Sequence, residues 1–180
     1  MLITYRDALE EYGSRYYLRK AVSEKKLKHV SRGFYSTSDT HDSLMMIVMK
    51  YPEGIVTGLT AYFMHGLTDT IPDVIDLATK RSGSKFRDSN IKQHFVPADW
   101  LNVGKETIVV EGVELPIYNQ ERMLLELARN RNKMPYDIYK EIVASYRKRA
   151  DTLDIYKLQD YAEVMPKGAK HLERIMKEVF

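Results

Sequence analysis

The feature that most constrains this fold is a polar, turn-prone segment from Ser36 to Asp42, which separates two differently patterned parts of the chain. Clusters of Ser, Thr and Asp between patterned segments are typical of loops. The part before it is short and basic, whereas the part after it alternates between helical and strand periodicities. We therefore predict a small domain over residues 1–38 and a larger domain over residues 39–180.

The composition is that of an ordinary globular protein. Of 180 residues, 44% are hydrophobic and 29% are charged, which allows a substantial buried core. There is no cysteine, so disulfides, thiolate metal sites and cysteine nucleophiles are excluded, as fits a reducing compartment. The longest wholly apolar run, Leu44 to Met49, is too short to cross a bilayer. We expect a cytoplasmic protein with no membrane partner.

The small domain begins with two predicted helices. In residues 4–12 the apolar residues share one helical face, and Thr4 with Asp7 forms a pattern like a capping box. Gly13 supplies a turn, and Ser14 is the predicted N-cap of a second helix that runs to about Ser23. We expect the second helix to bury Tyr17, Leu18, Ala21 and Val22.

Two short strands are predicted after these helices. Residues 27–30 and 34–37 have strand-forming composition, and Gly33 between them can adopt a positive φ. Two helices joined at a glycine and followed by a basic two-stranded ribbon have the order of a winged helix-turn-helix. This motif places its second helix in the major groove of DNA.

Positive charge is concentrated in this same region. Residues 14–35 contain seven basic side chains and one acidic side chain, a net charge of +6, while the whole chain carries only +3. A basic block on a mildly acidic body is typical of a nucleic-acid-binding module. The predicted DNA-binding residues are Ser14, Arg15, Tyr16, Arg19 and Lys20 on the helix, and Lys25, Lys26, Lys28 and Arg32 on the ribbon.

The larger domain is predicted to mix strands and helices. Expected helices cover residues 42–50, 59–65, 120–129, 136–149, 153–165 and 169–180, and expected strands cover residues 55–57, 74–78, 91–96, 107–110 and 113–118. The strands precede a helical C-terminal layer. The fold class is therefore α+β, with an N-terminal winged helix-turn-helix followed by a mixed α/β body.

Several segments resemble one known family. They are Ile3-Thr4-Tyr5-Arg6-Asp7, Gly13-Ser14-Arg15-Tyr16-Tyr17-Leu18, Lys26-Leu27-Lys28-His29-Val30-Ser31-Arg32-Gly33-Phe34-Tyr35, Thr57-Gly58-Leu59-Thr60-Ala61-Tyr62-Phe63-Met64-His65-Gly66-Leu67-Thr68 and Tyr118-Asn119-Gln120-Glu121-Arg122-Met123-Leu124-Leu125. Together they resemble the abortive-infection antitoxins of the AbiEi type, and the resemblance extends to about Leu127. No single motif among them is specific alone.

The resemblance implies a bacterial antitoxin of a type IV toxin-antitoxin system used in phage defence. Such a protein represses its own promoter by binding inverted repeats in double-stranded DNA. Its functional partner is a nucleotidyltransferase-like toxin, which it counters without a stable complex. The start of the chain departs from the pattern, since a winged helix usually has a further helix before the pair, and only Met1, Leu2 and Ile3 precede Thr4 here.

Two other functions remain as alternatives. The large body could neutralise a toxin by direct binding, because about 140 residues lie outside the predicted DNA reader. A metal-dependent nuclease could use Asp73, Asp76 and Lys80, but the two aspartates would point to opposite faces of a strand. The five histidines show no metal-ligand spacing. We therefore expect no enzyme activity, no metal site and no cofactor.

Overall fold

A computed structural model describes residues 2–31, 33–37, 43–110 and 113–180. It confirms the α+β class, with helices and two β-sheets in these ranges. The chain packs as two compact units: unit 1 is Met1–Pro52 with Val109–Val113, and unit 2 is Glu53–Ile108 with Glu114–Phe180. Part of the predicted boundary segment, residues 38–42, lies outside the described residues.

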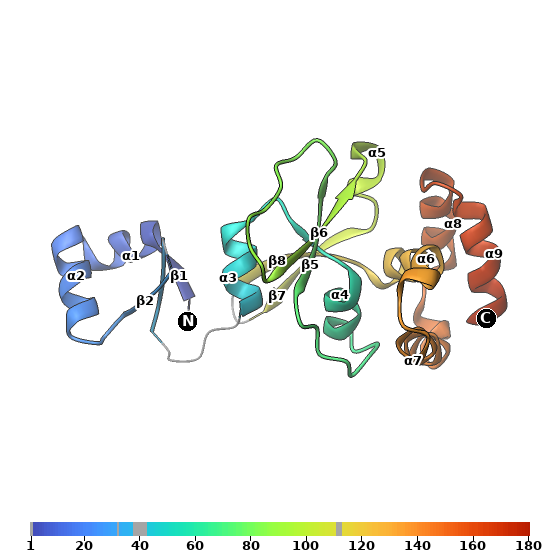
Figure 1. Cartoon of the computed structure of the whole chain (residues 1–180), viewed down its shortest axis with the longest axis horizontal. Coiled ribbons are helices and arrows are strands. Elements are labelled where there is room, and N and C mark those ends of the chain that lie inside the picture. Colours follow the sequence, from blue (N-terminus) through green and yellow to red (C-terminus); the bar gives the residue numbers. More distant parts are fainter. Residues whose placement is uncertain (1, 32, 38–42, 111–112) are drawn as a thin grey trace. The chain divides into compact units, whose positions relative to one another are not determined.

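Unit 1 contains a three-stranded antiparallel sheet and three helices, drawn in blue to cyan in Figure 1. Its elements are β1 (Leu2–Thr4), α1 (Tyr5–Tyr12), α2 (Arg15–Ser23), β2 (Lys28–Ser31), β3 (Phe34–Ser36) and α3 (Ser43–Lys50). The strand order is β1-β3-β2, so the first strand pairs with the last. Strand β1 was not predicted, because three residues are too few to show an alternating pattern.

Local hydrogen bonds explain where α1 and α2 begin. The predicted capping box is confirmed: the Asp7 backbone N–H donates to the Thr4 hydroxyl oxygen at 3.2 Å, and the Thr4 backbone N–H donates to the Asp7 carboxylate. Hydrogen bonds from the Thr4 hydroxyl and N–H lower the pKa of Asp7. Gly13 ends α1 with a φ of 76°, and Ser14 caps α2 by accepting from the Tyr17 N–H.

A small hydrophobic core holds unit 1 together. Its fully buried members come from β1, α1, α2 and the segment before β2: Ile3, Ala8, Leu18, Ala21 and Leu27. The prediction that Tyr17 belongs to this core is wrong, because its side chain is 58% exposed. A nine-residue helix beside a small sheet has room for only a narrow buried stripe, and Leu18 with Ala21 fills it.

Unit 2 is built on a five-stranded mixed sheet of strand order β6-β5-β4-β8-β7. Its elements are β4 (Ile55–Val56), α4 (Gly58–Met64), β5 (Ile75–Lys80), β6 (Ile91–Val96), α5 (Ala98–Leu101), β7 (Lys105–Val110), β8 (Val113–Tyr118), α6 (Gln120–Asn130), α7 (Tyr136–Arg147), α8 (Ile155–Val164) and α9 (Gly168–Glu178), with short 3-10 turns at Arg131–Lys133 and Ala150–Thr152. Strand β4 is antiparallel to β5 and parallel to β8. The hairpin predicted around Glu111 and Gly112 falls on residues outside the described ranges.

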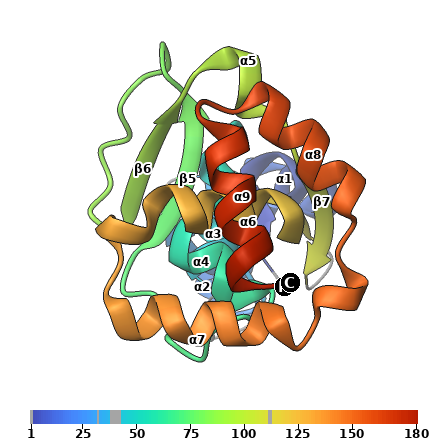
Figure 2. The same cartoon turned by 90° about the vertical axis from the view of Figure 1, so that its right-hand side faces the viewer.

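The C-terminal helices form the predicted helical layer. Helix α6 packs against α4, α8 and α9, and Figure 2 shows α6 and α9 with α7 and α8 beside them. Among the described α-helices and strands of unit 2, the four-residue helix α5 was not predicted, since one turn leaves no periodicity to detect, and the two short 3-10 turns were not predicted either. None of the described helices is both long and apolar enough to pass through a bilayer.

A fully buried arginine, Arg122, lies at the start of α6. Its guanidinium donates to the carbonyl oxygens of Trp100 and Val103 and to Glu126, at 3.0, 3.3 and 2.9 Å. It also lies over the Trp100 and Tyr118 rings, 4.8 and 4.6 Å from their centroids. This one side chain therefore joins α5, the end of β8 and α6.

Replacing Arg122 by Met keeps most of the side-chain volume but removes the buried one of the two arginines that pair with Glu126. We expect a loss of about 3 kcal/mol in the free energy of unfolding, because the change breaks a buried ion pair and leaves Glu126 with Arg129 as its one cationic partner among the described residues. Urea denaturation followed by circular dichroism measures this. The control Lys177→Gln removes only an exposed ion pair with Glu173 and should change little. A loss as small as the control's would show that the buried guanidinium does not hold unit 2 together.

Candidate nucleic-acid interface

The outer face of α2 carries the predicted reading residues. Arg15, Tyr16, Arg19 and Lys20 are all exposed, and Tyr16 has 70% of its side chain in solvent. Neither Arg15 nor Arg19 forms an ion pair with any part of the chain that the structure describes. Both guanidinium groups are therefore available to an external ligand.

The exposure of this face follows from how α2 packs. Leu18 and Ala21 point into the core of unit 1, so residues on the opposite side of the helix must face solvent. Tyr16 and Tyr17 extend this exposed surface, with their rings in edge-to-face contact at 5.3 Å between centroids. Ser14 has a structural position, since its hydroxyl caps the helix.

Glu24, the only acidic residue in the basic stretch, partly neutralises two of the predicted lysines. Its carboxylate lies 2.7 Å from Lys26 Nζ and 3.9 Å from Lys20 Nζ. The hydrogen bond from Lys26 lowers the pKa of Glu24, and the same bond raises the pKa of Lys26. Phosphate would therefore have to compete with Glu24 for both lysines.

The remaining predicted contacts belong to the turn and ribbon that follow α2. Lys25 is exposed and takes a left-handed backbone conformation with a φ of 57°, which ends the helix. Lys28 is exposed at the start of β2, opposite Ser36 of β3. Gly33 has the expected positive φ, at 86°. Arg32 lies outside the described residues.

A second basic cluster, Arg147-Lys148-Arg149, is structural, as its position at a helix end predicts. Arg149 donates to the carbonyl oxygens of His65 and Gly66, both at 2.7 Å. Arg147 donates to the Glu178 carbonyl oxygen at 2.6 Å. Arg149 therefore holds the turn that follows α4, and Arg147 contacts the end of α9 through its Nε.

The acidic residues considered for a nuclease do not form a carboxylate pair. Asp76 is 4% exposed, accepts from the Leu59 N–H and contacts His94 Nε2 at 2.6 Å. Asp73 lies before β5, and Lys80 at its end is exposed. Within the described ranges, no group of three or more His, Asp or Glu side chains is placed to hold a metal ion. Sequence reasoning missed the pairing of Asp76 with His94, because the two residues lie on separate strands.

Replacing Glu24 by Gln should strengthen binding to every duplex DNA, because it releases Lys20 and Lys26 from their shared partner. Each added phosphate contact steepens the dependence of log affinity on log salt by about 0.9. Fluorescence anisotropy over a salt series, with two unrelated duplexes, measures both quantities. The matched control is Glu163→Gln, which removes an exposed charge from α8. An unchanged salt slope would contradict a role for these lysines in phosphate binding.

Neither the models of known protein families nor the curated proteins compared with this chain match its sequence. Function must therefore be argued from the geometry and charge of the two units.

Proposed function

We propose that this protein is a sequence-specific DNA-binding antitoxin that represses its own promoter, and that unit 1 is its winged helix-turn-helix reader. The observation that carries the proposal is the exposed face of α2, where Arg15 and Arg19 have no ion-pair partner among the described residues. A helix of this kind fits the major groove of B-DNA.

The basic side chains of α2 and those of the turn and ribbon that follow it have different proposed roles. Arginine can form two hydrogen bonds with the O6 and N7 atoms of guanine, so Arg15 and Arg19 are the proposed base-reading residues. Lysine binds phosphate as a point charge, so Lys25, Lys26 and Lys28 are the proposed backbone contacts. Helix α1 exposes Asp7, Glu10 and Glu11, which phosphate would repel, and so it is assigned to the side away from DNA.

The topology of unit 1 supports the same proposal. Strand β1 comes before the helix pair and joins the β2–β3 ribbon in one antiparallel sheet, an arrangement that fits a winged helix. Helix α3 lies against β1 within the same compact unit. We assign α3 a packing role beside this sheet.

The antitoxin role rests on the resemblance to AbiEi-type proteins. Two of the resembling segments pack together in unit 2: the His65 ring contacts the Tyr118 carbonyl oxygen at 2.7 Å, and the Tyr62 hydroxyl donates to the Met123 carbonyl oxygen at 2.9 Å. The proposed operator contains inverted repeats in the protein's own promoter. The proposed functional partner is a nucleotidyltransferase-like toxin that is countered without a stable complex.

Gel-shift titration of the promoter tests the reader. Replacing Arg15 or Arg19 by Ala should cost about 1 to 3 kcal/mol of binding free energy on the operator and little on an unrelated duplex, because a lost base contact removes discrimination. Arg81→Ala removes the same charge from an exposed site in unit 2 and serves as the control. Operator binding by both α2 variants at the level of the control would remove α2 as the reading helix.

A further inference from the structure

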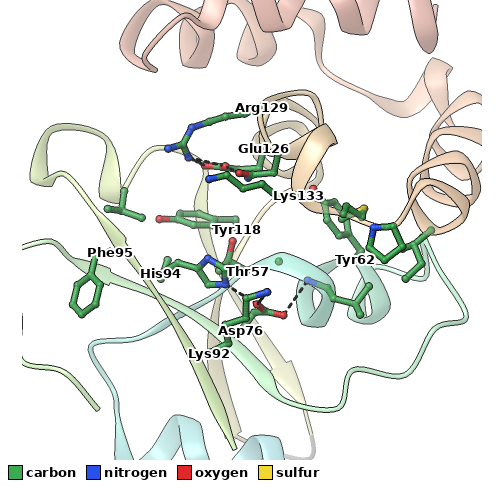
Figure 3. A pocket seen from close by; sticks show the side chains of 18 residues that line it. Thr57, Tyr62, Asp76, Lys92, His94, Phe95, Tyr118, Glu126, Arg129 and Lys133 are labelled. Atoms are coloured by element: carbon green, nitrogen blue, oxygen red, sulfur yellow. Dashed lines mark hydrogen bonds and ion pairs between the residues drawn. The ribbon is translucent and has the colours of Figure 1, made fainter. Parts of the chain in front are cut away.

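Unit 2 contains a pocket of about 460 Å³ that the proposed function does not use. Its walls come from the start of α4, from β5 and β6, from the end of β8, from the C-terminal half of α6 and from residues 133–138. Figure 3 shows the lining side chains converging from these elements. The volume lies within the range of about 300 to 1,000 Å³ that is usual for small-molecule sites.

One side of the pocket carries a neutralised aspartate. Asp76 lies on β5 directly opposite Lys92 of the parallel strand β6, and its carboxylate is 3.8 Å from Lys92 Nζ. It also contacts His94 at 2.6 Å and accepts from the Leu59 N–H at 3.2 Å. Gly58 makes this possible, because an added Cβ would lie 2.6 Å from the Asp76 carboxyl carbon. The Asp76 carboxylate therefore has its hydrogen-bond and ion-pair partners within the protein.

The side formed by α6 carries a neutralised glutamate. The Glu126 carboxylate accepts hydrogen bonds from Arg122, Arg129 and the Asn130 amide, at 2.9, 3.0 and 2.9 Å. Arg122 is fully buried and contacts Glu126 from the protein interior, so a cation outside the pocket lining already balances the charge of Glu126. Neither lining carboxylate is left to bind a cationic ligand.

The cationic side chains that line the pocket, in contrast, still have N–H groups that can donate to a ligand. Lys133 is exposed at the pocket and has no ion-pair partner within the described part of the chain. Arg129 uses only Nη1 in its bonds to Glu126, so Nη2 and Nε remain as donors. Lys92 has 66% of its side chain exposed beside the pocket. These three cations favour an anionic ligand.

The rest of the lining is aromatic and apolar. Tyr118 lies between the α6 group and the β5–β6 group in the view of Figure 3, and Tyr62, Met134 and Pro135 also line the pocket. The Tyr62 and Tyr118 hydroxyls donate to carbonyl oxygens of the protein, and burial raises the pKa of both groups. Both tyrosines are buried, with 2% and 1% exposed, so they form a fixed wall of the pocket, and Phe95 of β6, which is 42% exposed, is the lining ring open to a flat, uncharged group.

We propose that this pocket binds a nucleotide, with its phosphate held by Lys133, Arg129 and Lys92 and its base placed against the aromatic lining. A phosphate alone would leave most of the 460 Å³ empty, and an uncharged ring alone would leave Lys133 without a partner. Multiple N⁺–H donors are the usual partners of phosphate oxygens. The site lies within unit 2 and does not depend on the proposed reading of DNA by unit 1.

Calorimetric titration of the full chain, without DNA, tests the pocket. The probes are the adenosine, cytidine, guanosine and uridine monophosphates, the corresponding nucleosides, and inorganic phosphate. We expect at least one monophosphate to bind saturably, and to bind more tightly than its nucleoside and than inorganic phosphate. Replacing Lys133 by Gln should weaken that binding about tenfold, as expected for the loss of one charge-assisted hydrogen bond.

Two matched variants make the result decisive. Lys92→Gln should also weaken binding, whereas Lys157→Gln, at an exposed site on α8 outside the pocket, should not. Lys133 and Lys157 are exposed and have no ion-pair partner among the described residues, so thermal unfolding of these two variants should remain near that of the unchanged chain, whereas Lys92→Gln also removes an ion-pair partner of Asp76. Absence of monophosphate binding, equal affinity for inorganic phosphate, or equal effects of Lys133→Gln and Lys157→Gln would overturn the proposal.

Discussion

The buried guanidinium of Arg122 is the interaction on which unit 2 depends. A charge removed from water is stable only where its hydrogen-bond donors and its charge are both satisfied. Here two carbonyl oxygens, the Glu126 carboxylate and two aromatic rings provide most of that environment, and only Nε of the guanidinium has no hydrogen-bond partner among the described residues. The loop before β7 must approach closely for this to occur: Gly104 has a φ of 70°, and a Cβ there would lie 2.4 Å from Arg122 Cβ. The glycine is thus required by the arginine, and both are required by the junction of β8 with α6.

The ion pair between Arg122 and Glu126 also affects which charged groups the pocket offers to a ligand. Because Arg122 also pairs with Glu126 from the interior, Arg129 bonds Glu126 through Nη1 alone and keeps its other two nitrogens as donors. The Arg129 guanidinium also lies over the Trp100 ring, 4.7 Å from its centroid. A structural contact in the core therefore determines which functional groups the surface of the pocket offers.

The sequence predicts most elements of this fold, because their signals are local. The capping box of Thr4 and Asp7 and the turn at Gly13 each involve residues close together in the chain. Tyr17 shows what periodicity does not predict. Helical phase gives the direction in which a side chain points, but not the width of the helix surface that the neighbouring sheet buries. The pocket was missed for a related reason. Asp76, His94 and Glu126 come from three separate elements, and the only local sign was a period of two along β6, where Lys92, His94 and Val96 share one face.

In the proposed role of unit 1 as a DNA reader, the position of Glu24 provides a physical basis for selectivity. Attraction to phosphate is independent of sequence, so every unpaired lysine near the proposed reading helix would strengthen binding to all DNA. Glu24 forms ion pairs with Lys20 and Lys26, whereas Arg15 and Arg19 have no ion-pair partner among the described residues. Bidentate contacts from arginine to guanine depend on sequence, whereas lysine contacts to phosphate do not. An acidic residue beside the lysines therefore lowers non-specific affinity more than specific affinity, and the ratio of the two is what a repressor with one operator among many competing sites requires.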